Sequence, residues 1–251
     1  MTSDPINPYR PPQAEPPHFD GPAGAQGSIE QALAGNYDFD IGEVMSEAWE
    51  LTKGFKATFW GGALIVYGVV IAVMLVSGLL SKALFGDEPH LLMRMGTNAL
   101  ATLLTSPLTL GLIMLAVKRA AGVEVTFEVV FGCMNKAVPA IVVSFLTLIL
   151  TYLGLALLLI PGIYLSLAYG MAKPLLADRN LPPWQAMEVS RKALTHKWFQ
   201  ILGLSLGVGF LVLLSALFFG IGLIWTAPWS MLVLGVLYRR IFGTTEPTPV
   251  A

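Results

Sequence analysis

The stretch WFQILGLSLGVGFLVLLSALFFGIGLIWTAPWSMLVLGVLYRR, residues 198–240, contains two long apolar runs separated by a glycine-containing turn. The first run covers 198–219, and the second covers 221–237 before a pair of arginines ends it. A helix needs about 20 apolar residues to cross the hydrocarbon core of a bilayer. We therefore expect two transmembrane helices here, joined by a tight turn.

The rest of the chain repeats this pattern. The other expected spans are 59–80, 97–117, 137–157 and 162–176. Pro161 and Gly162 lie where the run 137–157 gives way to the run 162–176. The sequence leaves open whether the two runs form two helices or one. Of the 251 residues 55% are hydrophobic and 12% are charged, against about 25% charged in soluble domains. The fold class predicted is all-α: a polytopic membrane helix bundle of about six transmembrane helices.

The basic residues are distributed unevenly between the two sides of such a bundle. With six spans, Lys82 and Arg94 lie on one side, which leaves 13 of the 15 Lys and Arg residues on the other. Loops rich in Lys and Arg stay cytoplasmic. We therefore expect both termini to face the cytoplasm.

The membrane domain is expected to cover 39–241. Residues 1–38 are rich in Pro, Gly and Ala without apolar periodicity, which predicts a disordered cytoplasmic tail. Residues 242–251 are expected to form a short disordered C-terminal tail.

A short segment with helical spacing of apolar residues precedes each pair of spans. Asp40 and Glu43 resemble a capping box at the start of the first segment, and residues 184–198 form the third. The middle copy, 126–134, has the same position but a weaker pattern. The sequence thus favours three units, each an interfacial amphipathic helix followed by a helical hairpin.

Four stretches carry a resemblance to a known family. They are Ile160-Pro161-Gly162-Ile163-Tyr164, the sequence KPLLAD at 173–178, an amphipathic segment from Ala186, and Trp198-Phe199. Over roughly residues 40–240 the chain resembles a family of uncharacterised bacterial six-span integral membrane proteins. That family is similar to the membrane domain of glycerophosphoryl diester phosphodiesterases. The resemblance implies the fold and a location in the inner (plasma) membrane of a bacterium, and it carries over no catalytic residue.

One string, Gly203-Leu-Ser205-Leu-Gly207, has the form G-x-S-x-G. Soluble hydrolases place this motif at a strand-to-helix elbow, but here it lies inside an apolar run. No histidine lies within an expected span to serve as the base. We expect Gly203 and Gly207 to be helix-packing residues instead. A membrane hydrolase at Ser205 is the weakest hypothesis, so no enzyme, cofactor or metal site is expected.

Further small and hydroxyl-bearing residues lie inside the expected spans. The expected packing seam on the fourth span consists of Gly162, Ser166 and Gly170. Candidates for a polar path are Thr105, Ser106, Ser144, Thr147 and Thr151. The favoured interpretation is that such hydroxyls bond back to their own helix. A path for solute through helices kinked at Pro107 and Pro228 is the alternative.

Tryptophan residues and one lysine mark the expected cytoplasmic boundary. The expected interfacial anchors are Trp49, Trp60, Trp184, Trp198 and Lys173.

The function expected from these patterns is that of a non-enzymatic inner-membrane protein with a structural, accessory or envelope-related role. Its partners would be the lipid bilayer and either a membrane protein or a second copy of the chain. Nucleic acid is not expected as a partner, because the net charge is only −1. The alternative function is a transporter or channel for a neutral or lipidic solute.

Overall fold

A computed structural model describes residues 27–86, 91–217 and 220–245, and this part of the chain is helical without strands. The helices are α1 (Ile29–Ala34), α2 (Ile41–Leu51), α3 (Lys56–Phe85), α4 (Leu91–Ala120), α5 (Ala137–Leu157), α6 (Leu159–Ala168), α7 (Ala172–Arg179), α8 (Pro183–His196), α9 (Trp198–Leu217) and α10 (Leu223–Phe242), with 3₁₀ turns η1 (Phe127–Val130) and η2 (Met134–Lys136). The all-helical fold class is confirmed.

Within the described residues, five segments are long and apolar enough to cross a membrane. They are Lys56–Leu84, Met95–Ala120, Phe127–Leu157, Leu159–Arg179 and Trp198–Leu217. Length and composition thus make the chain a multi-pass membrane protein. Helix α10 is not among the five, although it is 20 residues long, because arginine, tryptophan and proline dilute its apolar run.

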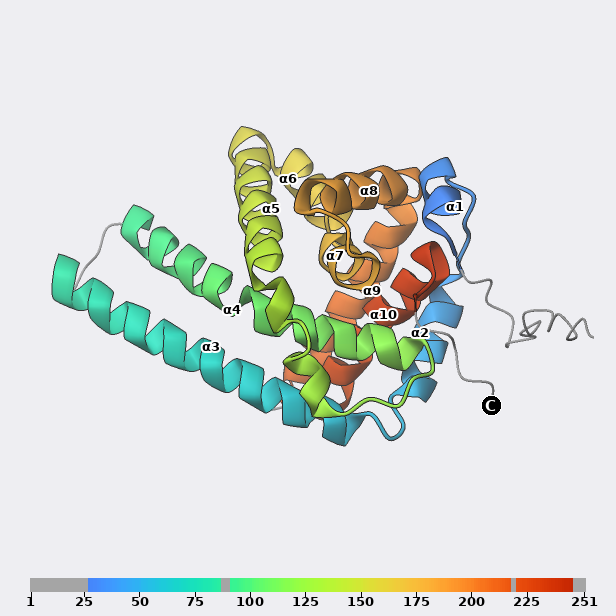
Figure 1. Ribbon diagram of the computed structural model, residues 1–251, viewed down its shortest axis with the longest axis horizontal. Helices are drawn as coiled ribbons and strands as arrows, with labels where there is room; N and C mark the ends of the chain where they lie inside the picture. The colour runs from blue at the N-terminus through green and yellow to red at the C-terminus, as the bar shows by residue number, and fades with distance from the viewer. Residues whose placement is uncertain (1–26, 87–90, 218–219, 246–251) are drawn as a thin grey trace, which may run out of the picture.

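Helices α4 and α10 lie at the centre of the molecule. Helix α10 packs against α2, α4 and α9, whereas α4 packs against α3, α5, α7 and α10. The largest fully buried side chains include Tyr238 and Phe242 of α10 and Leu110 and Leu115 of α4. The helices are not aligned as one parallel bundle. Helices α3 and α4 extend away from the other helices as an arm, while α5 and α9 run across that direction (Figure 1).

The fourth expected span, 162–176, is divided differently in the structure. Helix α6 begins at Leu159, after Leu158 adopts an extended backbone, so α5 and α6 are separate helices. Pro161 lies in the first turn of α6, where a missing backbone N–H costs no intrahelical hydrogen bond. The residues between α6 and α7 then break the span a second time.

The expected tails are shorter than predicted where the structure describes them. Ser28 caps α1 at its start, and Gly35 ends it in a left-handed conformation (φ 74°). Tyr37 and Phe39 are buried, so residues 27–38 belong to the folded part rather than to a tail. At the other end α10 continues to Phe242, which is also buried. Residues 1–26 and 246–251 lie outside the described residues.

The amphipathic segments pack in a regular order. Helix α2 is capped as expected, since the Asp40 carboxylate accepts a hydrogen bond from the Glu43 backbone N–H at 2.9 Å. Helix α8 packs against α5, α6 and α7, and η1 packs against α3 and α4. Each segment therefore lies against the helices that precede it. Helix α2, the first in the chain, lies instead against the last helix, α10.

Candidate functional site

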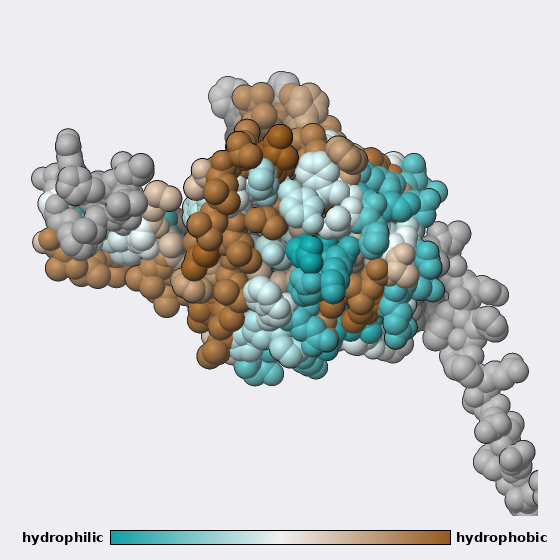
Figure 2. All heavy atoms as spheres, turned by 90° about the horizontal axis from the view of Figure 1, so that it is seen from above, coloured by the Kyte–Doolittle hydropathy of each residue, from teal (hydrophilic) through white to brown (hydrophobic). Residues whose placement is uncertain are grey.

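The polar surface of the molecule collects several helix ends in one region. Figure 2 shows hydrophilic residues gathered over one side, whereas hydrophobic residues cover the side toward the arm formed by α3 and α4. Several helix ends meet at this polar face, namely those of α2, α4, α7 and α10. Cations near these ends contact backbone carbonyls of a neighbouring helix or turn. We take this face as the candidate site.

Four cations bind terminal backbone carbonyls in this way. The contacts are Arg239 Nη1 to Ala120 O at 2.5 Å, Arg179 Nη2 to Phe242 O at 2.6 Å, Arg119 Nη2 to Lys53 O at 2.9 Å, and the Lys136 ammonium to Ala177 O. The last carbonyls of a helix lack intrahelical partners and carry partial negative charge. Arg239, Arg179 and Lys136 therefore cap the end of another helix, and Arg119 binds the turn that follows α2. These contacts fix where the helix ends meet.

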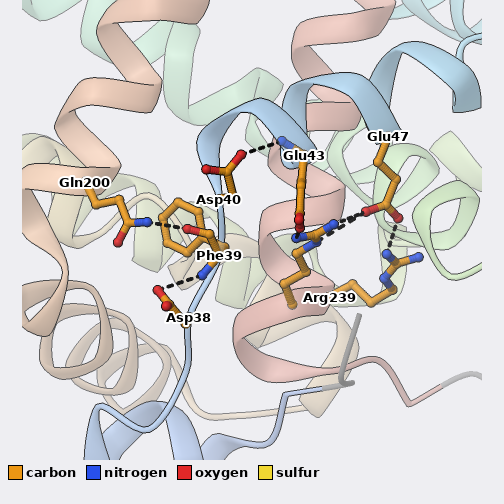
Figure 3. Close-up of polar contacts among 8 residues, drawn as sticks. Asp38, Phe39, Asp40, Glu43, Glu47, Gln200 and Arg239 are labelled. Atoms are coloured by element: carbon orange, nitrogen blue, oxygen red, sulfur yellow. Dashed lines mark hydrogen bonds and ion pairs between the residues drawn. The ribbon is translucent and has the colours of Figure 1, made fainter. Parts of the chain in front are cut away.

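The strongest ionic contacts join α2 to α10 (Figure 3). Arg240 donates to Glu47 at 2.8 Å and to Glu43 at 2.9 Å, and Arg239 pairs with the other carboxylate oxygen of Glu47. We call Glu43, Glu47, Arg239 and Arg240 the ion-pair cluster. The exposed fraction is 10% for the Arg240 side chain, 15% for Arg239 and 25% for Glu47, so solvent screens the three charges only in part.

A second set of contacts holds the segment after α1 against α8 and α9. The Tyr37 hydroxyl donates to the Ala193 carbonyl at 2.8 Å, and burial raises the pKa of Tyr37 to about 12. The Lys197 ammonium donates to the Asp38 carboxylate at 2.8 Å, which lowers the pKa of that carboxyl. Gln200 of α9 also donates to a backbone carbonyl of this segment, as Figure 3 shows.

The break between α6 and α7 is bridged by Ser190 of α8. The Ser190 hydroxyl accepts a hydrogen bond from the Met171 backbone N–H at 3.2 Å and donates to the Ala168 carbonyl at 2.7 Å. Ser190 is fully buried, so it satisfies backbone groups that the helix break leaves free. Sequence reasoning missed this residue. The available signal was a serine on the apolar side of an amphipathic helix.

The predicted packing glycines differ in their surroundings. A Cβ at Gly162 would collide with Leu155, and Gly154 of α5 approaches Gly162 closely, so α5 and α6 lie in close contact at these two glycines. A Cβ at Gly203 would meet only Ile41 Cδ1 at 3.6 Å, and one at Gly207 would meet nothing within 4 Å. Within the described residues α9 packs inward through Ile201 and Leu204, and Gly203 and Gly207 make no close helix contact.

The remaining residues of that group do not form a seam. Ser166 is exposed and its hydroxyl donates to the Ile163 carbonyl of its own helix at 2.8 Å. Gly170 lies in the turn between α6 and α7, and Ser205 lies on the exposed side of α9.

The candidate polar-path residues fall into two classes. On α4 the hydroxyls of Thr105 and Ser106 donate to carbonyls of their own helix at 2.9 and 2.8 Å. On α5 the hydroxyl oxygens of Ser144, Thr147 and Thr151 are buried and have no hydrogen-bond partner within the described part of the chain. The structure therefore separates one satisfied group of hydroxyls from one unsatisfied group.

The predicted anchors also differ among themselves. Trp49 and Trp184 are exposed, as an interfacial position requires. Trp60 instead donates its indole N–H to the Ile224 carbonyl at 3.1 Å and so connects α3 with α10. Trp198 packs against Phe199 with ring centroids 5.0 Å apart. Lys173 is half-buried and makes no hydrogen bond or ion pair with a described residue.

Among residues 27–86, 91–217 and 220–245, no group of three His, Cys, Asp or Glu side chains is placed to hold a metal ion. Comparisons of the chain with protein-family models, with curated proteins and with solved structures found no match. A functional interpretation therefore depends on the residues and their geometry.

Proposed function

We propose that the chain is a multi-pass protein of the bacterial inner membrane with a non-enzymatic structural, accessory or envelope-related role. It acts through contacts with lipid and with a membrane protein or a second copy of itself. The observation that carries the proposal is the contrast between two surfaces. Large apolar side chains are exposed along α3 and α9, whereas the charged groups of the polar face bind one another and the helix ends.

Contacts among four helix ends favour six membrane crossings with both termini in the cytoplasm, whereas the Trp60–Ile224 hydrogen bond joins the start of α3 to the start of α10 and opposes a full crossing by α10. Residues 51–53, 119–120, 178–179 and 239–245 contact one another at the polar face. If all four of these segments lie on one side of the membrane, the chain crosses an even number of times between one segment and the next. The five apolar segments and α10 together supply six crossings. The excess of Lys and Arg on this side then favours the cytoplasm.

The packing order also supports three repeated units. In this proposal α2, the η1–η2 segment and α8 each begin a unit, and a pair of crossings follows. Each beginning segment packs on the preceding unit, and α2 closes the series by packing on α10. The ion-pair cluster holds the first unit to the last. This arrangement agrees with the six-span family that the sequence resembles.

Transport of a neutral or lipidic solute is the second candidate function. The three unpaired hydroxyls on α5 are the observation that favours it, since buried hydroxyls without partners are uncommon and costly. They lie at intervals of three and four residues, so they share one face of the helix.

Vesicles containing the purified protein test the choice between these functions. We expect the permeability to glycerol to equal that of protein-free vesicles. We also expect the triple variant Ser144→Ala, Thr147→Val and Thr151→Val to complement a deletion strain as well as the wild-type protein does, with envelope integrity as the readout. Protein-dependent glycerol flux that the triple variant abolishes, and that the control Ser166→Ala retains, would establish transport instead.

A further inference from the structure

A pocket of about 560 Å³ lies between α2, α9 and α10. Its walls are formed by Met45 and Trp49 of α2, by Leu211 and Leu214 of α9, and by Thr226 and Trp229 of α10. Pockets that hold small organic ligands have volumes of roughly 300–1,000 Å³. The volume is therefore sufficient for a ligand of that size.

Three polar side chains of the α9 and α10 walls already have partners. The Trp229 indole N–H donates to the Met45 carbonyl at 3.0 Å. The hydroxyls of Ser215 and Thr226 donate to carbonyls of their own helices at 2.8 and 3.1 Å. A polar solute would lose its hydrogen bonds to water on entering and would find few replacements. The walls therefore suit an apolar group.

The α2 side of the pocket also carries polar groups, which we call the rim. Ser46 contributes to the lining, and Glu50 lies one helical turn further along α2. Both residues are exposed, and the Glu50 carboxylate makes no hydrogen bond or ion pair with a described residue. Apolar walls beside a polar rim fit an amphiphilic molecule, with its apolar part inside and its polar end at the rim.

The wall that α9 contributes belongs to a helix with an exposed apolar surface. Leu206, Phe210, Leu213 and Leu217 are exposed on this helix, which is one of the five segments able to cross a membrane. Lipid chains are the medium that covers such a surface in a bilayer. A phospholipid can therefore enter the pocket from the bilayer without passing through water.

We propose that this pocket binds one acyl chain of a bilayer phospholipid, whose headgroup lies at the rim beside Ser46 and Glu50. The inference deepens the lipid contact of the proposed function and rests on it. It makes α2, α9 and α10 the elements through which the protein retains a specific lipid, rather than only being surrounded by lipid.

Neighbouring leucines on α9 provide a matched test. Leu214 lines the pocket, whereas Leu213 is exposed outside its lining. The full-length protein is reconstituted in vesicles of phosphatidylethanolamine and phosphatidylglycerol, with a trace of phospholipid that carries a photoreactive diazirine in its acyl chain. After irradiation, labelling of the lining residues Met45 and Trp229 is measured by peptide mass spectrometry. We expect Leu214→Trp to reduce this labelling roughly tenfold, because the larger ring fills the pocket, and Leu213→Trp to leave it unchanged.

A second filling variant, Thr226→Leu, covers the case in which Leu214→Trp does not fold, and it should also reduce the labelling. Equal labelling in the wild type, both filling variants and the Leu213→Trp control would overturn the inference. That result would leave the proposed function intact, since its test is glycerol flux and complementation. Protein-dependent flux would contradict the proposed function whatever the labelling shows.

Discussion

Replacing Gly111 with alanine is expected to lower the melting temperature of the purified protein by about 6–12 °C, which corresponds to roughly 3 kcal/mol for a chain of this size. Gly111 lies on α4 where η1 crosses it, and a Cβ there would fall on the backbone carbonyl of Val130. Because the obstacle is backbone rather than a flexible side chain, η1 or α4 must move. Thermal unfolding in detergent, followed by loss of the monodisperse peak in size-exclusion chromatography, measures the effect.

Gly207→Ala is the matched control for this prediction. Gly207 is also a glycine inside a helix, but a Cβ added there would meet no atom within 4 Å. We expect its melting temperature to stay close to that of the wild type. If Gly207→Ala were the destabilising change and Gly111→Ala the neutral one, α9 would pack through the glycine pair that the sequence suggested, and the described packing of α4 and η1 would be wrong.

Glu47→Gln is expected to destabilise the protein by about 2–3 kcal/mol. Glu47 is the only member of the ion-pair cluster that bonds both arginines, so its loss leaves Arg239 and Arg240 adjacent with little compensation. Breaking a fully buried pair costs more, but Glu47 retains 25% exposure, and water can partly solvate the remaining charges. The readout is the melting temperature in detergent at low ionic strength.

Glu43→Gln serves as the control within the same cluster. Its side chain is 63% exposed and pairs only with Arg240, so we expect a cost of at most about 1 kcal/mol. The double variant Glu47→Gln, Arg240→Gln should be less destabilised than the sum of its single changes, because the second change removes a charge that the first left unpaired. Strict additivity, with equal effects of Glu43→Gln and Glu47→Gln, would contradict the role assigned to the cluster.

Local sequence signals predicted some elements well. Helix α5 covers the residues expected for the third span, and Asp40 caps α2 as its spacing from Glu43 indicated. Helix α1 was not predicted, because its six residues follow a Pro-rich segment and gain stability from tertiary contacts of Tyr37 rather than from propensity. The sequence could not show which partner each charge has.

The glycines illustrate the same limit. Gly207 and Gly111 are both small residues in apolar helices, and the pattern around Gly207 resembles a packing motif more closely. The difference between them lies in the neighbouring element, since η1 crosses α4 at Gly111 while no described residue lies within 4 Å of a Cβ at Gly207. Ser190 is similar, because its role depends on a helix break about 20 residues earlier in the chain.

The central claim is that α10 crosses the membrane together with the five apolar segments, so that all the joined helix ends lie in the cytoplasm. Cysteine labelling tests it directly. In a Cys133→Ser background, single cysteines replace Lys82, Glu124, Lys192 or Thr245, and intact cells are treated with a membrane-impermeant maleimide. We predict that only the Lys82→Cys protein is labelled, and that the other three react after the inner membrane is permeabilised. Labelling of Thr245→Cys in intact cells, with Glu124→Cys still protected, would mean an odd number of crossings and would contradict the account.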